Sequence, residues 1–364
     1  MIRFDAVSKN YPNGTTAVDD LSLELAEGGI TVLVGPSGCG KTTTLRMINR
    51  MVEPTTGTVS LRGRDIREVN APELRRGIGY VIQHAGLFPH RTVLDNIATV
   101  PLLLGWSRKK ARARAAELLE LVGLPAEMAK RYPNQLSGGQ QQRVGVARAL
   151  GADPPVLLMD EPFSAVDPIV RAELQAEFIR LQKELHKTIV FVTHDIDEAI
   201  KLGNNIAVFR TGGRLAQFDT PERLLTSPAD EFVADFVGHD RGIRRLSFVK
   251  AAEVPLREGP VLSATSPVAE ARAVKEPWVL VVDDARRPLG WAPVAELPDS
   301  GTLVDVQLAP LGHTFSLVGD SARAALDSAL LSPARLAVGV DADGAVVGAA
   351  DVHEITGSPG GGDR

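Results

Sequence analysis

The chain has 364 residues, of which 44% are hydrophobic and 23% are charged, and its formal net charge is −5 at pH 7. This length predicts two or more domains, and the acidic balance argues against a nucleic-acid-binding surface as its main role. Its single cysteine, Cys39, excludes an internal disulfide. The N-terminal residues lack the basic and apolar regions of a signal peptide, and no apolar run approaches the roughly 20 residues that span a bilayer, so we expect an intracellular protein without a membrane anchor.

Short strands are predicted over residues 2–7 and 21–25, and a buried strand over residues 30–34. A G-x-x-x-x-G-K-S/T phosphate loop follows directly, and a helix is expected to begin within it. The loop and the residue after it give the candidate nucleotide-binding residues, which are Gly35, Pro36, Ser37, Gly38, Cys39, Gly40, Lys41, Thr42 and Thr43. Backbone N–H groups in such a loop surround a triphosphate; Lys41 is expected to reach its β- and γ-phosphates, and the Thr42 hydroxyl to bind Mg²⁺. Since Cys39 lies near the helix N-terminus, we also expect a reactive thiolate there, with a buried, inert cysteine as the alternative.

Residues 87–150 have a helical pattern, in which the basic run at 108–114 reads as a solvated helix face. Within this region Ser137-Gly138-Gly139-Gln140 is expected to open a helix. Because helix N-termini attract anions, this segment is a second candidate phosphate site.

Two further apolar runs, at residues 156–159 and 189–192, end in polar residues. Asp160 is expected at the carboxyl edge of a parallel sheet, where its carboxylate can hold Mg²⁺ through water. Glu161 is the candidate for polarising the attacking water, and His194 for contacting the γ-phosphate. A solvated acidic turn is the alternative for Asp160 and Glu161, and the four apolar residues before them argue against it.

The order of the phosphate loop, Gln83, the segment 136–140 (LSGGQ), Asp160 with Glu161, Asp167 and His194 resembles the ABC (ATP-binding cassette) ATPase family over residues 1–240. The resemblance implies an α/β fold, an ABC-type P-loop NTPase with a RecA-like core and antiparallel β and helical subdomains. It implies ATP and Mg²⁺ as cofactors, with Thr42, Gln83 and Asp160 as the Mg²⁺ ligands and Glu161 and His194 as the catalytic residues. Tyr11 matches the aromatic residue that stacks on adenine, and an ordinary tyrosine at a strand end is its alternative.

The same resemblance implies partners. Two cassettes of this family pack head to tail, so that Ser137 and Asp167 would lie at the interface with a second copy of the chain or a close paralogue. The helical insertion and the Gln83 segment would meet transmembrane permease subunits.

Longer strings, at residues 44–50, 86–90, 96–101, 195–203 and 232–238, resemble the ATPase subunits of glycine betaine/carnitine/choline (osmoprotectant) importers. This implies a transport-coupled ATPase held at the cytoplasmic face of the membrane through its permease, with an extracytoplasmic solute-binding protein and no nucleic acid. An importer for another small solute, such as an amino acid or polyamine, is the alternative, and a non-transport ABC ATPase is a more distant one.

Beyond a linker expected at 241–250, two segments repeat an Asp and a Gly at equal separation, Asp283 with Gly290 and Asp341 with Gly348. They resemble a tandem pair of cystathionine-β-synthase-type (CBS) modules in a smaller α+β domain, with copy 1 at 251–308, copy 2 at 309–357 and a disordered tail at 358–364. Neither copy has the Ser or Thr that usually binds ribose shortly before the module's final Asp. Residues 250–364 carry 9 basic and 16 acidic side chains, the wrong sign for an anionic lipid surface. Nucleotide binding, sensing of ionic strength and a purely structural role all stay open.

Overall fold

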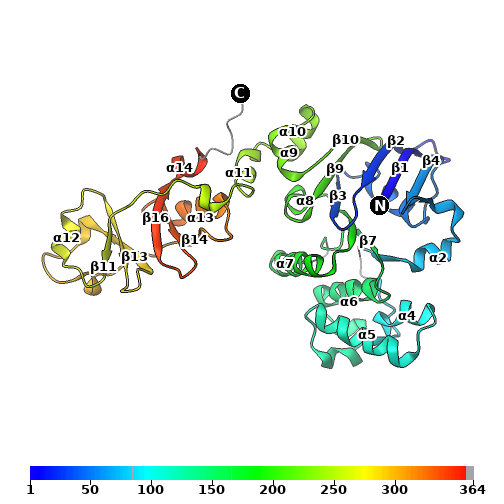
Figure 1. Ribbon diagram of the computed structural model, residues 1–364, viewed down its shortest axis with the longest axis horizontal. Coiled ribbons are helices and arrows are strands. Elements are labelled where there is room, and N and C mark those ends of the chain that lie inside the picture. The colour runs from blue at the N-terminus through cyan, green and yellow to red at the C-terminus, as the bar shows by residue number, and fades with distance from the viewer. Residues whose placement is uncertain (84–85, 165, 358–364) are drawn as a thin grey trace. The chain divides into compact units, whose positions relative to one another are not determined.

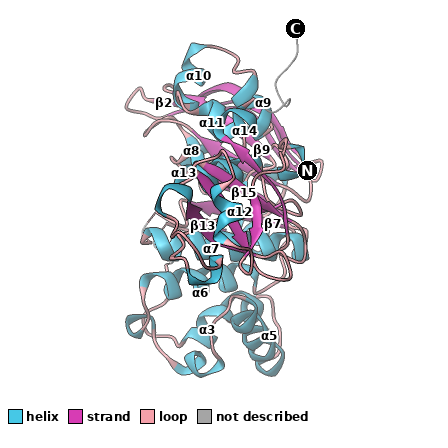
Figure 2. Cartoon of the chain, turned by 90° about the vertical axis from the view of Figure 1, so that its left-hand side faces the viewer, coloured by secondary structure: helices cyan, strands magenta, loops and turns pink. Residues whose placement is uncertain are grey.

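The computed structural model describes residues 1–83, 86–164 and 166–357, so the tail expected at 358–364 lies outside the described residues. The chain forms two compact units, Met1–Val237 (unit 1) and Gly238–Arg364 (unit 2), whose elements are drawn in Figures 1 and 2. Among the described helices, none is both long and apolar enough to cross a bilayer.

A six-stranded sheet forms the centre of unit 1, in the order β10-β9-β3-β8-β7-β6. Its strands are β3 (Ile30–Val34), β6 (Ile78–Val81), β7 (Val156–Asp160), β8 (Thr188–Val192), β9 (Asn205–Arg210) and β10 (Arg214–Asp219). All neighbours pair in parallel except β9 and β10. Every residue of β3, β7 and β8 is buried, which is why these strands read as continuous apolar runs in the sequence.

An antiparallel sheet of order β2-β1-β4-β5 is the second layer of unit 1. It is built from β1 (Ile2–Asn10), β2 (Thr16–Leu25), β4 (Thr56–Leu61) and β5 (Arg64–Asp65). The strands predicted at 2–7 and 21–25 are parts of the longer strands β1 and β2. Register shifts between the two strands interrupt the alternation of buried and exposed residues.

The helices of unit 1 divide into two groups. Those around the central sheet are α1 (Lys41–Ile48), α2 (Ala71–Arg76), α7 (Pro168–Leu185), α8 (Ile196–Leu202), α9 (Pro221–Thr226) and α10 (Glu231–Val237). The helical region, gathered at one end of unit 1 in Figure 1, holds α3 (Val93–Ile97), α4 (Thr99–Leu103), α5 (Arg108–Leu121) and α6 (Gly138–Leu150). In α5 the alanines and leucines at 111, 115, 118 and 119 are buried, and Arg112 pairs with Asp95 on the exposed side at 2.9 Å.

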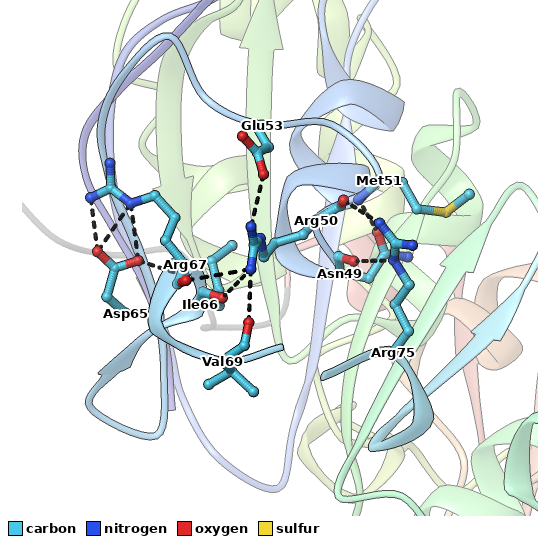
Figure 3. Close-up of polar contacts among 9 residues, drawn as sticks. All are labelled: Asn49, Arg50, Met51, Glu53, Asp65, Ile66, Arg67, Val69 and Arg75. Atoms are coloured by element: carbon cyan, nitrogen blue, oxygen red, sulfur yellow. Dashed lines mark hydrogen bonds and ion pairs between the residues drawn. The ribbon is translucent and has the colours of Figure 1, made fainter. Parts of the chain in front are cut away.

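Two arginines fasten the C-terminal end of α1, the helix that follows the phosphate loop (Figure 3). Arg50 donates to the carbonyl oxygens of Ile66 at 3.2 Å and Val69 at 2.7 Å. Arg75, at the end of α2, donates to those of Asn49 at 3.1 Å and Arg50 at 2.6 Å. Arg75 therefore satisfies carbonyls that the end of α1 leaves open and complements the helix dipole. Arg50 joins the same end of α1 to the residues 66–69, which lead through α2 into β6.

We expect Arg50→Ala to lower the free energy of unfolding of unit 1 by about 1–3 kcal/mol, because partly buried carbonyls lose their donors. Arg67→Ala is the matched control: it removes the same charge from an exposed ion pair with Asp65, and such pairs contribute about 0–1 kcal/mol. Urea unfolding gives the free energy of unfolding of both variants, and the comparison holds when the slope of free energy against urea concentration is unchanged. Equal losses in the two variants would contradict a fastening role for Arg50.

Unit 2 repeats one three-stranded sheet twice. The first sheet comprises β11 (Val261–Ser263), β12 (Trp278–Val282) and β13 (Pro288–Pro293), and the second β14 (Thr314–Ser316), β15 (Leu336–Val340) and β16 (Val346–Asp351). In both, the first pair of strands is parallel, the second antiparallel, and the register shifts near the end of the middle strand. The helices of unit 2 are α11 (Arg241–Arg245), α12 (Val268–Arg272), α13 (Ala322–Leu331) and α14 (Val352–Thr356).

The repeated Asp and Gly have structural roles in these sheets. Asp283 and Asp341 each accept two backbone N–H groups in the turn between the middle and last strands. A Cβ on Gly290 would lie 2.7 Å from Leu308 Cβ, and one on Gly348 2.9 Å from the carbonyl oxygen of Arg257. Close approach of a neighbouring segment therefore requires glycine at both positions.

The segment 241–250, expected as a linker, contains α11. Leu246 and Val249 are buried in the hydrophobic cluster that also includes Phe315 and Leu326. In this structure the segment is thus part of unit 2, because its apolar residues complete the core of the second repeat.

Candidate functional site

The phosphate loop connects β3 to α1, and two of its glycines have no room for a side chain. Gly35 has φ +149° and Gly40 has φ +96°. A Cβ on Gly35 would lie 2.3 Å from the carbonyl oxygen of Phe209, and one on Gly40 2.0 Å from that of Ala17. The loop is therefore pressed against neighbouring backbone, and its own N–H groups line the turn into α1.

Lys41, the first residue of α1, is buried, and its Nζ lies inside the loop. It donates to the carbonyl oxygens of Gly35 at 2.8 Å and Pro36 at 3.0 Å. Its third partner is the Cys39 Sγ at 3.7 Å. A buried ammonium group whose partners are all neutral favours an anion beside it, since a buried charge needs an opposite one. Thr43, half-buried, lies in the first turn of the same helix.

The expectation of a reactive thiol at Cys39 is wrong. The Cys39 side chain is fully buried, and burial raises the pKa of the thiol even though the charge of Lys41 opposes this. A neutral, inaccessible thiol is a poor nucleophile. Sequence reasoning located the residue near a helix N-terminus but had no measure of its burial.

Thr42 and Asp160 meet at the carboxyl edge of the central sheet. The Thr42 hydroxyl donates to Asp160 Oδ1 at 2.8 Å, and the Asp160 side chain is buried. Its other oxygen, Oδ2, faces Tyr80 Oη at 3.4 Å and Arg46 Nη2 at 3.6 Å. A carboxylate beside a hydroxyl oxygen is a suitable ligand set for Mg²⁺.

No sequence motif pointed to Tyr80 or Arg46. Tyr80 lies in β6 next to β7, and Arg46 lies in α1 one turn after Thr42. Burial raises the pKa of the Tyr80 hydroxyl above its usual value, and a hydrogen bond with Arg46 offsets only part of this rise. The only available signal was the position of Tyr80 three residues before Gln83.

Glu161 is brought together with Gln83 and His194. Gln83 Nε2 donates to Glu161 Oε2 at 3.4 Å, and His194 Nδ1 lies 3.3 Å from the same oxygen. Glu161 has φ +46°, and its N–H donates to the Val192 carbonyl at 3.0 Å. A non-glycine residue in the left-handed region is strained, and such strain gathers at functional sites. Gln83 thus contacts Glu161, whereas Thr42 and Asp160 form a separate pair.

Ser137 and Asp167 are exposed and are the N-cap residues of α6 and α7. The Ser137 hydroxyl accepts the Gln140 N–H at 3.3 Å while Gln140 Oε1 accepts the Ser137 N–H at 3.0 Å, so that the pair caps α6. Asp167 caps α7 by accepting the Val170 N–H at 3.1 Å. A Cβ on Gly139 would lie 2.8 Å from Val170 Cγ1, and therefore the starts of α6 and α7 pack directly together, with Gly138 exposed beside them.

Tyr11 lies in the turn after β1, where its N–H donates to the Thr15 carbonyl at 2.9 Å. The residue is 36% exposed, and Lys9 Nζ lies 5.2 Å from the ring centroid. The accessible ring is compatible with stacking on a base, which stays a prediction.

Comparison with known proteins gives concordant matches. Residues 18–164 match the ABC transporter family. The osmoprotectant import ATP-binding protein OsmV of Salmonella typhimurium is 46% identical to this chain, and the alignment covers 88% of this chain and 85% of the relative. The glycine betaine/carnitine/choline transport ATP-binding protein OpuCA of Bacillus subtilis is 49% identical over 78% of this chain and 76% of its own.

A solved dimeric ATP-binding cassette, in a post-hydrolysis state bound to ADP and Pi, has a similar fold. It superposes with a TM-score of 0.55 at 35% identity and covers 61% of this chain and 99% of the solved one.

Proposed function

Since the chain belongs to the ABC transporter family, we infer that it is the ATP-hydrolysing subunit of an importer for quaternary-amine osmoprotectants. The extent of the match to the Salmonella relative carries this inference, because 88% of the chain is covered while unit 1 holds only 237 of the 364 residues. The alignment therefore includes much of unit 2 and is not limited to the cassette that all ABC ATPases share.

ATP is the nucleotide of this family, and the phosphate loop is its site in this chain. Gly35 to Gly40 offer backbone N–H groups to the phosphates, and Lys41 would exchange its two carbonyl partners for β- and γ-phosphate oxygens. Thr42 and Asp160 would hold Mg²⁺, and the Gln83 side chain would join them only after leaving Glu161. The metal ion neutralises charge on the phosphates during transfer.

The contact of Glu161 with Gln83 and His194 supports the assignment of these three residues to the hydrolytic step. The Glu161 carboxylate would accept a hydrogen bond from the attacking water and orient it. The exposed His194 imidazole would donate to the γ-phosphate. Gln83 would link the nucleotide site to the permease subunits, because the chain continues from it to the exposed residues Phe88 and Pro89.

The exposed caps of α6 and α7 support a head-to-tail pair of cassettes, like the dimeric relative bound to ADP and Pi. Ser137, Gly138, Gly139 and Gln140 would then face the γ-phosphate held by Lys41 of a second copy or a close paralogue, and Asp167 would lie at the same interface. Permease subunits would hold the pair at the cytoplasmic face of the membrane, and an extracytoplasmic binding protein would deliver the solute.

Unit 2 is proposed to be a tandem CBS-like module, since its two sheets share one strand order and one register shift. The Asp351 carboxylate accepts the Glu354 N–H at 2.9 Å and pairs with Arg257 at 2.7 Å. These contacts give Asp351 a structural role, and they favour a module that packs or regulates without binding ribose there.

Deletion of unit 2 distinguishes the two roles. The cut belongs after Val237, because Leu246 and Val249 are part of the core of unit 2. We expect the truncated subunit to retain basal ATP hydrolysis within about twofold, since unit 1 has its own core. Uptake by the reconstituted importer over a salt series then decides: a flattened salt response shows regulation, and equal loss at every salt concentration shows a structural role.

The function itself is tested by solute uptake. A reconstituted importer should accumulate glycine betaine, carnitine or choline when ATP is supplied. Uptake of an amino acid or polyamine in their place would support the alternative class of importer.

A further inference from the structure

A buried polar cluster lies behind Glu161 and His194, and the roles proposed above do not use it. Glu198 of α8 and Gln175 of α7 are each 7% exposed. Gln175 Nε2 donates to Glu198 Oε1 at 2.9 Å, and Lys201 Nζ donates to Gln175 Oε1 at 2.9 Å. A buried carboxylate is costly unless it is hydrogen-bonded, and Gln175 supplies such a bond here.

One side of the cluster holds the segment that carries His194. The Thr193 hydroxyl accepts the Asp195 N–H at 3.1 Å, and it lies near enough to the Glu198 carboxylate to lower the pKa of that carboxyl. Asp195 Oδ1 in turn accepts the Glu198 N–H at 3.3 Å. The Glu198 backbone is therefore tied directly to Asp195, and its side chain joins α8, which follows His194, to Gln175 of α7.

The other side of the cluster reaches the segment that follows Glu161. Arg171 lies on α7 one turn before Gln175, and its Nη2 donates to the Val166 carbonyl at 3.1 Å. Arg171 and Glu198 line one small cavity together with Glu161 and His194. Burial raises the pKa of the Glu198 carboxyl, whereas hydrogen bonds from Thr193 and Gln175 and the charge of Arg171 lower it. Arg171 Nε is buried without a hydrogen-bond partner in the described part of the chain.

We propose that Glu198 is a positioning residue for ATP hydrolysis, which holds the His194 segment in register with Glu161 and the described residues after it, 162–164 and 166–167. The two segments follow the neighbouring parallel strands β7 and β8. The helices after them, α7 and α8, are joined by the hydrogen bond from Gln175 to Glu198. Separating them would leave the buried polar groups of Glu198 and Gln175 without hydrogen-bond partners, which is costly inside a protein. The hydrolytic residues and the start of α7 therefore move together.

This proposal rests on the roles of Glu161 and His194 inferred above, and its test separates the two. We expect Glu198→Ala to lower kcat of the full-length chain by about 10- to 100-fold, since small displacements of positioned groups have effects of this size. The affinity for ATP should stay within about twofold of the unmodified chain, because the phosphate loop is untouched. Glu198→Gln preserves the size and an acceptor for Gln175 Nε2 and should recover most of the rate. Glu173→Gln, the same change at an exposed position of α7, is the control.

Two readouts distinguish positioning from a general loss of folding. Rates are expressed per nucleotide-binding site, so that an unfolded fraction cancels. Amide hydrogen exchange should rise in Glu198→Ala at both segments, 161–164 with 166–167 and 193–197, and stay unchanged in Glu173→Gln.

A double variant completes the test. If Glu198 acts in large part through His194, adding Glu198→Ala to His194→Ala should lower kcat by a smaller factor than Glu198→Ala does in the unmodified chain. Multiplicative losses, or a normal rate per site in Glu198→Ala, would overturn the proposal. A normal rate in His194→Ala alone would instead overturn the assignment of His194.

Discussion

Glu161→Gln should abolish turnover and leave ATP binding intact. Replacing the carboxylate by an amide removes the negative charge and basicity that polarise the water, and groups of this kind contribute about 10²- to 10⁴-fold to the rate. The substitution preserves size, and the Glu161 backbone contact with Val192 does not depend on the side chain. ATP should therefore accumulate unhydrolysed between two cassettes, and size-exclusion chromatography with MgATP should show a dimer that the unmodified chain forms only transiently.

Glu120→Gln, an exposed change on α5, is the control and should hydrolyse ATP normally. A Glu161→Gln variant that turns over at the rate of the unmodified chain would contradict the assignment. A variant that loses ATP binding as well would show that the strained turn at Glu161 supports the phosphate loop and not the hydrolytic step.

Lys41→Ala should act at the preceding step and weaken nucleotide binding. Hydrogen bonds to charged groups contribute about 1.5–3 kcal/mol, so losing the ammonium group should raise the Kd for ATP by about 10- to 100-fold. Fluorescent nucleotide titration measures this directly. The carbonyls of Gly35 and Pro36 lose their donor in this variant, and for that reason its unfolding should be measured alongside.

Lys109→Ala removes the same charge from an exposed position on α5 and should leave the Kd unchanged. Unaltered ATP affinity in a folded Lys41→Ala variant would show that the triphosphate does not lie in this loop.

The sequence was sufficient for features that depend on local pattern. The buried strands could be predicted from apolar runs because parallel strands are covered on both faces. The phosphate loop and Ser137 could be found because a fixed backbone geometry requires glycine, lysine or a capping hydroxyl at fixed spacing. The pairing of Thr42 with Asp160 follows from the placing of both at one sheet edge.

Features that depend on contacts between distant segments could not be read in this way. The burial of Cys39 is set by packing between the two sheets of unit 1, and it reversed the expected reactivity of the thiol. Tyr80, Arg46 and Glu198 act on site residues from other elements, and no local spacing marks them. The segment 241–250 looked like a linker because its few apolar residues acquire partners only in the folded core of unit 2.

Uptake by the reconstituted importer tests the central claim most directly. The chain, its permease and its binding protein are placed in liposomes with internal MgATP, and accumulation of labelled glycine betaine is followed with choline, carnitine and spermidine as competitors. We predict ATP-dependent accumulation that choline or carnitine suppresses and spermidine does not, and its loss when the chain carries Glu161→Gln. Accumulation that persists with Glu161→Gln, or that spermidine alone suppresses, would contradict the account.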